Sequence, residues 1–281
     1  MESTSLATVK PAKPVAAYIG GKRNLSSRLV PIIDRIPHGT YAEPFVGMGG
    51  IFLKRRRRPT AEAINDISGD VVTLFRILQR HYQQFMDVLR WQITSRAEFD
   101  RLQKVDPETL TDLERAARFL YLQKLAFGGK VEGRNFGVDA KRPARFDLTK
   151  LEPMLADVHE RLSGVSIERL HFAEFIRRYD HRGALFYLDP PYYDCEGDYG
   201  PDVFGREDFA RLAEQLAGLA GGFILSINDR PEVREIFAAF RQIGVETTYS
   251  IATAAAGAGK RVGELVITNL PAELVQLAAN D

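Results

Sequence analysis

One short motif combines an acid, two prolines and an aromatic ring. Asp189, Pro190, Pro191 and Tyr192 directly follow the apolar residues 184–188, which predict a buried strand. Two prolines end a strand and stiffen the chain that leaves it. The Asp189 carboxylate and the Pro190 carbonyl can accept both hydrogens of an exocyclic amine while Tyr192 stacks on a flipped-out base. With both N–H groups held, the nitrogen lone pair turns toward an electrophile. The motif therefore predicts attack by a base amine, and an ordinary proline-rich loop is the alternative.

Two further groups of candidate ligands also follow predicted strands. A glycine-rich turn over residues 42–50 would let the backbone approach a ligand, although a plain structural turn explains it equally well. The turn has neither the GxGxxG nor the GxxxxGK[ST] spacing, so a phosphate is not the obvious ligand. Asp66 ends the next strand, where a carboxylate suits a ribose diol. By itself, Asp66 is more simply explained as an N-cap for a helix that begins near Ser68.

Strands alternate with helices on both sides of a helical middle region. This order predicts an α/β fold: a doubly wound, Rossmann-like sheet interrupted by a mainly helical insert. The predicted strands are 15–19, 39–45, 61–64, 165–170, 184–188, 222–227, 246–251 and 264–268. The predicted helices include 51–57, 71–89, 96–102, 113–125, 209–219 and 231–240. Because an open sheet binds its ligands at the carboxyl ends of the strands, the three candidate sites should meet at one edge.

The same pattern predicts how the chain divides. Residues 1–14 carry two lysines and two prolines but no apolar segment, and we expect a flexible tail. Residues 15–75 and 165–281 are predicted to form the catalytic domain. Residues 76–164 have little strand character and contain a basic, glycine-rich loop, so we expect an inserted target-recognition domain there.

The motifs, taken together, resemble those of the Dam-like DNA adenine methyltransferases. Residues 18–22 (YIGGK) match that family's aromatic-x-Gly-Gly-Lys motif, and residues 43–49 (EPFVGMG) match its EPFxGxG loop. Asp66 matches its ribose-binding acid, and residues 189–192 match its DPPY motif. Residues 225–229 and 260–265 are similar to two later motifs. The resemblance spans about residues 16–270, and motifs in the family's order are far more specific than any one alone.

The resemblance implies an S-adenosylmethionine-dependent methyltransferase acting on N6 of adenine in DNA. Its catalytic residues would be Asp189, Pro190 and Tyr192. Its cofactor-binding residues would be Tyr18, Gly20, Gly21, Lys22, Glu43, Phe45, Gly47, Asp66, Phe172 and Asp189. Glu43, Phe45 and Gly47 would line the methionine side of the pocket, and Phe172 would lie near the cofactor's adenine. Phe172 follows His171, where the family often has Asp, and we assign His171 no role.

Candidate DNA contacts are basic or amide residues in the central loop and in a late segment. They are Arg134, Asn135, Lys141, Arg142 and Arg145, together with Lys260 and Arg261. For each loop residue, a solvated surface position is an equally good explanation. The basic run over residues 54–58 is better explained by helix-dipole complementation and solubility. The particular residues of the family's recognition loop are not present, so no recognition sequence follows.

Three other activities remain alternatives. Transfer to N4 of cytosine is the nearest, although those enzymes more often carry Ser in place of Asp189. Relatives that methylate RNA or a protein amide usually have Asn there. A DNA-binding protein without catalysis would not need Lys22, Asp66 and Asp189 together. C5-cytosine transfer would need a cysteine nucleophile, usually after a proline, whereas Cys195 follows Asp194.

The composition sets limits on compartment and partners. The single cysteine excludes an internal disulfide and a cysteine-rich zinc site, and we expect no bound metal. No apolar run approaches the ~20 residues that span a bilayer, and no secretory signal is evident, so we expect a cytoplasmic protein. The net charge of +1 requires basic residues to gather locally if the partner is double-stranded DNA. We expect a bacterial or phage enzyme; a separate cognate restriction nuclease would not be visible in this chain, and its oligomeric state is not indicated.

Overall fold

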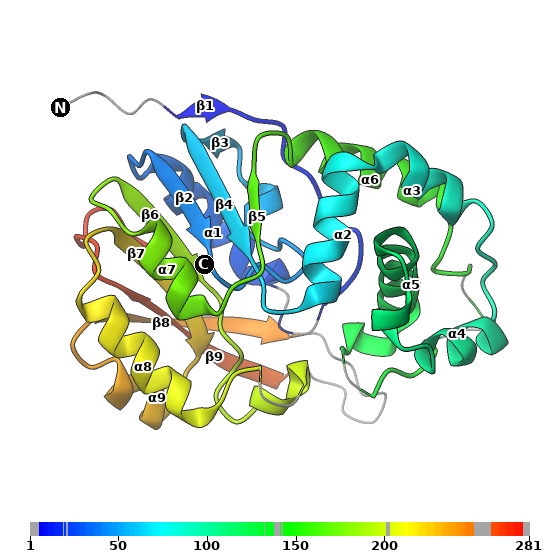
Figure 1. Ribbon diagram of the computed structural model, residues 1–281. Coiled ribbons are helices and arrows are strands. Elements are labelled where there is room, and N and C mark those ends of the chain that lie inside the picture. Colours follow the sequence, from blue (N-terminus) through cyan, green and yellow to red (C-terminus); the bar gives the residue numbers. More distant parts are fainter. Residues whose placement is uncertain are drawn as a thin grey trace.

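Seven strands form one sheet in the computed structural model, which describes residues 6–18, 20, 22–131, 133–137, 141, 143–200, 203–249 and 260–277 (Figure 1). The side chains of residues 23, 24, 198, 199, 247–249 and 260–262 lie outside this description. The order across the sheet is β5-β4-β2-β6-β7-β9-β8. The strands are β2 (Thr40–Glu43), β4 (Ala61–Asn65), β5 (Ser166–Glu168), β6 (Ala184–Leu188), β7 (Gly222–Asn228), β8 (Arg241–Tyr249) and β9 (Lys260–Thr268). The strands from β5 to β7 in this order pair in parallel, whereas β9 runs antiparallel to β7 and β8.

Alternate residues of each strand enter two separate hydrophobic cores. Tyr41 and Tyr187 belong to one core, whereas their neighbours Ala42 and Leu188 belong to the other. This split is expected for a sheet that is covered on both faces, because successive side chains point to opposite sides. α7 (Phe172–Tyr179), α8 (Arg206–Ala217) and α9 (Pro231–Ile236) cover one face. α1 (Arg23–Arg35), α2 (Gly69–Arg80) and α6 (Leu148–Arg161) cover the other, which confirms the doubly wound α/β fold.

Three more helices of the described residues come between α2 and α6 along the chain, and in Figure 1 they lie beside the sheet. They are α3 (Tyr82–Leu89), α4 (Arg96–Gln103) and α5 (Asp112–Leu125). Short 3₁₀ turns η2 (Pro107–Thr109) and η3 (Phe127–Gly129) flank α5. A capping box fixes the start of α5: Thr111 and Glu114 each accept from the other's backbone N–H. The apolar residues of these helices continue the core formed by α1, α2 and α6.

Part of the segment for which we expected a flexible tail pairs with residues later in the chain. β1 (Ala7–Thr8) pairs antiparallel with β3 (Arg57–Arg58), and Ala12 donates its N–H to the Leu53 carbonyl at 2.7 Å. Ala12 is buried against the core. The cause is long-range pairing with a segment more than 40 residues later, which local composition does not predict.

The basic run over residues 54–58 also differs from its expected role. No helix spans it: η1 (Phe52–Lys54) is one short turn, and β3 follows. Arg55 is fully buried, while Lys54 donates to the Ser26 hydroxyl at 2.6 Å. The strand expected over 15–19 does not form in the described part of that segment, and His81 separates α2 from α3, where one helix was predicted. No helix among the described residues is long and apolar enough to cross a membrane.

Candidate active site

A cleft lies along the edge of the sheet where the parallel strands end. Its volume is ≈ 1380 Å³, and the ends of β2, β4 and β6 line it together with the segment before α1. β2 and β6 are neighbours, yet the chain leaves them in opposite directions across the sheet, which is where open sheets bind ligands. Of the predicted cofactor-binding residues, the lining contains Tyr18, Gly20, Lys22, Glu43, Phe45, Gly47, Asp66, Phe172 and Asp189. Gly21 lies outside the described residues.

Asp66 ties the end of β4 to the glycine turn that follows β2. Its carboxylate accepts the backbone N–H of Gly47 and that of Ser68, each at 2.9 Å. Burial raises the pKa of Asp66 to about 6, although both N–H groups act in the opposite direction. Gly47 has φ +49°, and a Cβ there would lie 3.2 Å from the Tyr18 ring, so the close approach needs glycine. The N-cap of α2 is Ser68, which leaves Asp66 as an acid in the cleft.

Lys22 connects a half-buried acid, Asp189, and a buried one, Glu264, with the tyrosine of the DPPY motif. Its Nζ lies 2.9 Å from Asp189 Oδ1 and 3.8 Å from Glu264 Oε2, and it donates to the Tyr192 hydroxyl. That hydroxyl in turn donates to Glu264 Oε1. The Lys22 side chain is 1% exposed and Glu264 0%, whereas Asp189 is 22% exposed. Among these three charged side chains, Asp189 is therefore the most exposed in the cleft.

Burial sets the protonation of Asp189. Loss of hydration raises the pKa of this carboxyl to about 6, against the attraction of Lys22 and a hydrogen bond from Ser226, while Glu264 adds to the rise. Ser226 on β7 also bonds to the Tyr187 hydroxyl at 2.7 Å. Asn228 ends β7, and its amide pairs with both the N–H and the carbonyl of Tyr193, each at 2.9 Å. These contacts fix the chain as it leaves the DPPY motif.

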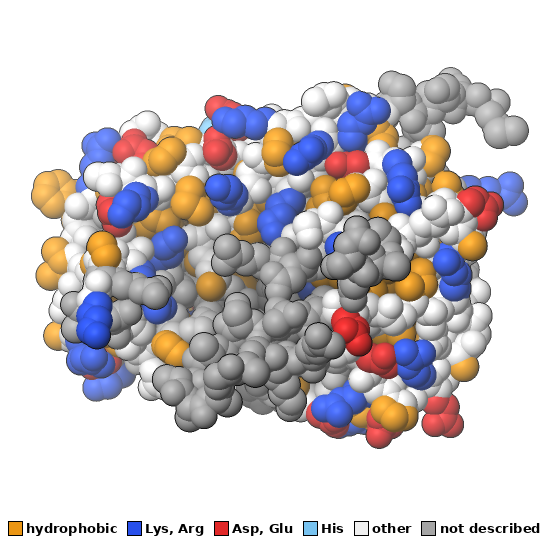
Figure 2. Space-filling view, turned by 180° about the vertical axis from the view of Figure 1, so that it is seen from behind, with side chains coloured by type: hydrophobic (Ala, Val, Ile, Leu, Met, Phe, Trp, Pro, Cys, Tyr) orange, Lys and Arg blue, Asp and Glu red, His pale blue; other side chains and the backbone are white. Residues whose placement is uncertain are grey.

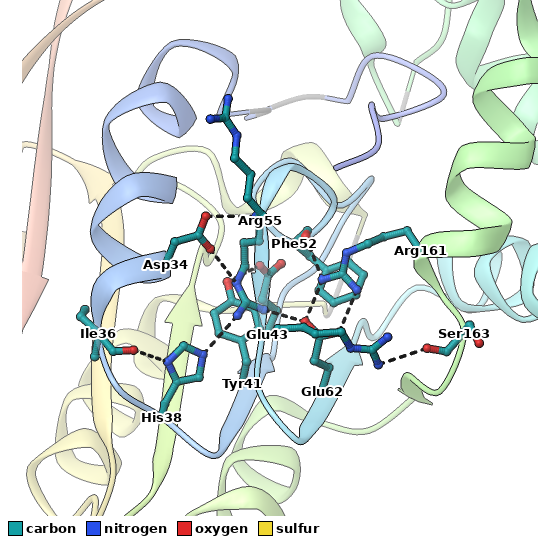
Figure 3. Close-up of polar contacts among 12 residues, drawn as sticks. Asp34, Ile36, His38, Tyr41, Glu43, Phe52, Arg55, Glu62, Arg161 and Ser163 are labelled. Carbon is teal, nitrogen blue, oxygen red and sulfur yellow. Dashed lines mark hydrogen bonds and ion pairs between the residues drawn. The ribbon is translucent and has the colours of Figure 1, made fainter. Parts of the chain in front are cut away.

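Glu43 is another acid that lines the cleft, and its side chain is buried. It accepts the Tyr41 hydroxyl at 2.6 Å and is 1% exposed (Figure 3). Burial raises the pKa of Glu43 to about 8, with the Asp189 carboxylate adding to the rise and the Tyr41 bond opposing it. At neutral pH this acid is therefore mostly protonated in the ligand-free protein.

A buried charge network lies directly behind Glu43. The Arg55 guanidinium lies 3.5 Å from the Tyr41 ring centroid, and its Nη1 lies 2.8 Å from Glu62 Oε1. Arg161 binds both oxygens of Glu62 at 2.7 Å (Figure 3). All three charged side chains are 0% exposed. His38 accepts from Arg55 at 3.1 Å, and burial together with Arg55 lowers its pKa to about 4, so it is neutral.

Comparison with known protein families shows to which family this chain belongs. The model of the D12 class N6 adenine-specific DNA methyltransferase matches residues 18–251. The chain belongs to this family. It is a site-specific DNA methyltransferase that uses S-adenosylmethionine and methylates adenine at N6. The match confirms the family resemblance seen in the motifs and favours N6 of adenine over N4 of cytosine.

Curated relatives align over most of the chain. The type II methyltransferase M.CviBI of Paramecium bursaria Chlorella virus NC1A is 24% identical over 263 residues, covering 92% of this chain and 99% of the viral protein. The type II methyltransferase M1.LlaDCHI of Lactococcus lactis subsp. cremoris is 25% identical, covering 92% of this chain and 95% of that protein. The DNA N-6-adenine-methyltransferase of Escherichia phage P1 is 26% identical over 82% of this chain but only 32% of its own length.

The cleft of this D12-class enzyme suits its methyl donor. S-adenosylmethionine is positive at its sulfonium and its ammonium, and it carries a ribose diol and an adenine ring. Burial raises the pKa of three acids in the cleft: Glu43, Asp66 and Asp189. A positive or hydrogen-donating ligand would therefore stabilise the carboxylate form of each acid. Phe45 and Phe172, with ring centroids 5.6 Å apart, supply an aromatic wall. His171 caps α7, since its ring nitrogen accepts from Ala173 N–H, and it also lines the cleft.

The structure describes only some of the side chains that were predicted to contact DNA. Arg134 is half-buried: its Nη2 lies 3.4 Å from Gln123 Oε1, and its guanidinium carbon lies 5.9 Å from the Phe119 ring centroid. Asn135, Lys141 and Arg145 are exposed. Arg142 lies outside the described residues, as do the side chains of Lys260 and Arg261. On the face in Figure 2, the Lys and Arg side chains of the described residues are spread among acidic and apolar ones.

The central loop is anchored beside the entrance of the cleft. Gln123 on α5 donates to the carbonyls of Ala17 and Gly129, at 2.8 Å and 2.7 Å. A Cβ on Gly129 would come within 2.9 Å of the Tyr18 nitrogen, so the loop and the cofactor segment are in close contact. This contact is a feature that the sequence did not predict, because α5 and Ala17 are about 100 residues apart.

Five functional candidates were absent from the sequence prediction: Tyr41, Tyr187, Ser226, Asn228 and Glu264. Ser226 and Asn228 do belong to one of the family-like motifs, which indicated their importance but not their contacts. Glu264 belongs to another, where the basic residues Lys260 and Arg261 drew attention instead. An acid that follows two basic residues in a late strand carries no signal of its own for a buried site.

Proposed function

We propose that Asp189 and the Pro190 carbonyl hold the N6 amine of an adenine flipped out of double-stranded DNA, so that its lone pair faces the methyl group of S-adenosylmethionine. One observation carries the proposal: in a cluster with the buried Lys22 and Glu264, Asp189 is the charged side chain that is most exposed in the cleft, at 22%. The cofactor supplies a methyl group on a positive sulfur. The amine nitrogen displaces the sulfur in line, which depends on the alignment of the nitrogen with the methyl group. Positioning of the two reactants should therefore supply much of the rate enhancement.

Tyr192 has a proposed stacking role that its contacts permit. Lys22 Nζ lies 4.1 Å from the Tyr192 ring centroid and donates to the Tyr192 hydroxyl, so it lies at the hydroxyl end of the ring and not over its face. A flipped base would stack on a face of the ring. The bonds of the hydroxyl to Lys22 and Glu264 hold the ring by its edge.

The cofactor contacts are proposed as follows. Asp66 would take the ribose hydroxyls, and Phe172 and Phe45 would contact the adenine and methionine sides. Tyr18, Gly20, Gly21, Lys22, Gly47 and Asp189 would complete the set, with Glu43 at the positive methionine end.

The affinity for S-adenosylmethionine is expected to rise with pH between 6.5 and 8. A positive ligand beside Glu43 favours its carboxylate, whereas burial holds the pKa of the ligand-free acid at about 8, so binding must expel a proton below that pH. The dissociation constant should therefore fall by up to about tenfold per pH unit. Calorimetric titration of wild type and Glu43→Gln measures it. The Gln variant, which has no proton to lose, should lose this pH dependence, and a pH-independent wild type would contradict the assignment of Glu43.

The helical insert, residues 76–164, is proposed as the target-recognition domain, with Arg134, Asn135, Lys141, Arg142 and Arg145 as its DNA contacts. Its loop adjoins the segment before Lys22, which supports a role close to an extruded base. Lys260 and Arg261 are proposed as further phosphate contacts. Because two relatives are named type II methyltransferases, a separate cognate nuclease in a restriction–modification pair is proposed as well.

Base flipping predicts a specific effect of mismatches. Once the methylated sequence is known from sequencing treated DNA, the duplex can be made with the target adenine opposite a mismatched base. Flipping a paired base costs a few kcal/mol of binding free energy, and flipping a mismatched base costs less. The enzyme should therefore bind the mismatched duplex about tenfold tighter, or more, than the fully paired duplex. The control carries the same mismatch at a base pair outside the recognition sequence. Equal affinity for both mismatched duplexes would show that the adenine stays in the helix.

A further inference from the structure

Glu264 is a fully buried acid in the middle of β9, the strand of the described sheet that runs against its neighbours. Because β9 is reversed, its first half lies at the edge where the parallel strands end. In this register Glu264 pairs with Asn228 on β7 and with Val245 on β8. The reversal thus brings an acid from the last strand of the sheet to the DPPY motif.

A buried carboxylate is costly unless it is paired and hydrogen-bonded. Glu264 uses both oxygens toward the active site: Oε1 accepts the Tyr192 hydroxyl and Oε2 faces Lys22 at 3.8 Å. An ammonium has three N–H donors. Lys22 donates to the Tyr192 hydroxyl and lies 2.9 Å from Asp189 Oδ1, while Glu264 Oε2 attracts the same Nζ from 3.8 Å, beyond hydrogen-bond distance.

We infer that Glu264 is a positioning residue for methyl transfer: it holds Lys22 and Tyr192 so that the Asp189 carboxylate and the tyrosine ring meet the flipped adenine in register. The inference rests on the proposed role of Asp189. Without the second acid, Lys22 is free to move entirely toward Asp189, and the Tyr192 hydroxyl keeps only one of its two partners. The base would then be held less firmly in line with the methyl group, although Glu264 is not among the residues that line the cleft.

The charges around Asp189 give a readout that a merely structural residue would not change. Asp189 is faced by Lys22, by Glu43 on β2, by Tyr187 on its own strand, by Ser226 on β7 and by Glu264 on β9. The Glu264 carboxylate raises the pKa of Asp189. Removing that charge should lower this pKa. Because the ionised Asp189 is the form that accepts the amine, the acidic limb of the pH–rate profile should move to lower pH.

The experiment compares Glu264→Gln with wild type in single-turnover methyl transfer over pH 5 to 8. The rate constant at pH 8 should fall about ten- to hundredfold, the acidic limb should move to lower pH, and the dissociation constants for cofactor and DNA should change little. Val266→Ala, two residues along the same strand and buried in the core, is the control: it should lower thermal stability without moving the limb.

A double-mutant cycle with Lys22→Met tests whether Glu264 acts through Lys22. In that background Glu264→Gln should have a much smaller effect than in wild type. An unchanged rate and pH profile in Glu264→Gln, with an active wild type, would overturn the inference. Failure of the wild-type enzyme to methylate adenine would instead overturn the proposed function, so the two failures are distinct.

Discussion

Asp189→Asn is expected to slow methyl transfer at least about 100-fold while the protein stays folded and binds S-adenosylmethionine. The substitution keeps the size of the side chain but removes the charge that faces Lys22 and replaces one acceptor oxygen with a donor. Loss of one preorganised group that orients or stabilises the reacting atoms typically costs 10²–10³ in rate, about 3–4 kcal/mol. Single-turnover transfer from labelled cofactor measures the rate, and calorimetry measures binding.

Asp194→Asn is the matched control for this prediction. It makes the same change five residues along the same loop, at an exposed acid that lies 3.0 Å from Arg206. Asp194 has φ +71°, a conformation that Asn also tolerates. Its rate should stay within about twofold of wild type, as expected for a surface ion pair. A wild-type rate in Asp189→Asn, or a loss explained by cofactor binding alone, would contradict the role assigned to Asp189.

Glu62→Ala is expected to lower the free energy of unfolding by about 3–5 kcal/mol. The substitution leaves Arg55 and Arg161 as fully buried cations whose shared counter-charge has gone (Figure 3). Removing one member of a buried charge network is far more destabilising than replacing the whole network with apolar residues, because the remaining charges stay desolvated. Arg55 also lies against the Tyr41 ring, so the loss extends toward Glu43.

Urea unfolding followed by linear extrapolation measures this change. Glu174→Ala provides the control, since it removes a partly exposed acid 2.9 Å from Arg178 on the same helix. That pair should contribute no more than about 0.5 kcal/mol. A loss below about 1 kcal/mol in Glu62→Ala would show that the buried network does not stabilise the fold as described.

The sequence predicted those parts of the site that follow from local order along the chain. Glycines after a strand, an acid after the next strand and Asp189 before two prolines each identify the end of a parallel strand, and such ends share one edge. The cleft accordingly contains Gly47, Asp66 and Asp189. Alternating strands and helices likewise indicated the doubly wound sheet, because periodicity is a local property.

The parts that sequence analysis missed depend on contacts between distant residues. Arg55 looked like one member of a solvated basic run, but it is buried because Glu62 and Arg161, 99 residues apart, meet beside it. Glu264 reaches the site only because β9 is reversed, and reversal is set by sheet pairing rather than by its own sequence. Similarly, the pairing of β1 with β3 orders the N-terminal segment, which on composition alone resembles a tail.

The most direct test of the central claim is the identity of the methylated base. Unmethylated genomic DNA is incubated with the enzyme and isotope-labelled S-adenosylmethionine, and the nucleosides are then separated by mass spectrometry. We predict labelled N6-methyladenine from wild type and from Asp194→Asn, and almost none from Asp189→Asn. Labelled N4-methylcytosine, or equal N6-methyladenine from wild type and Asp189→Asn, would contradict the account.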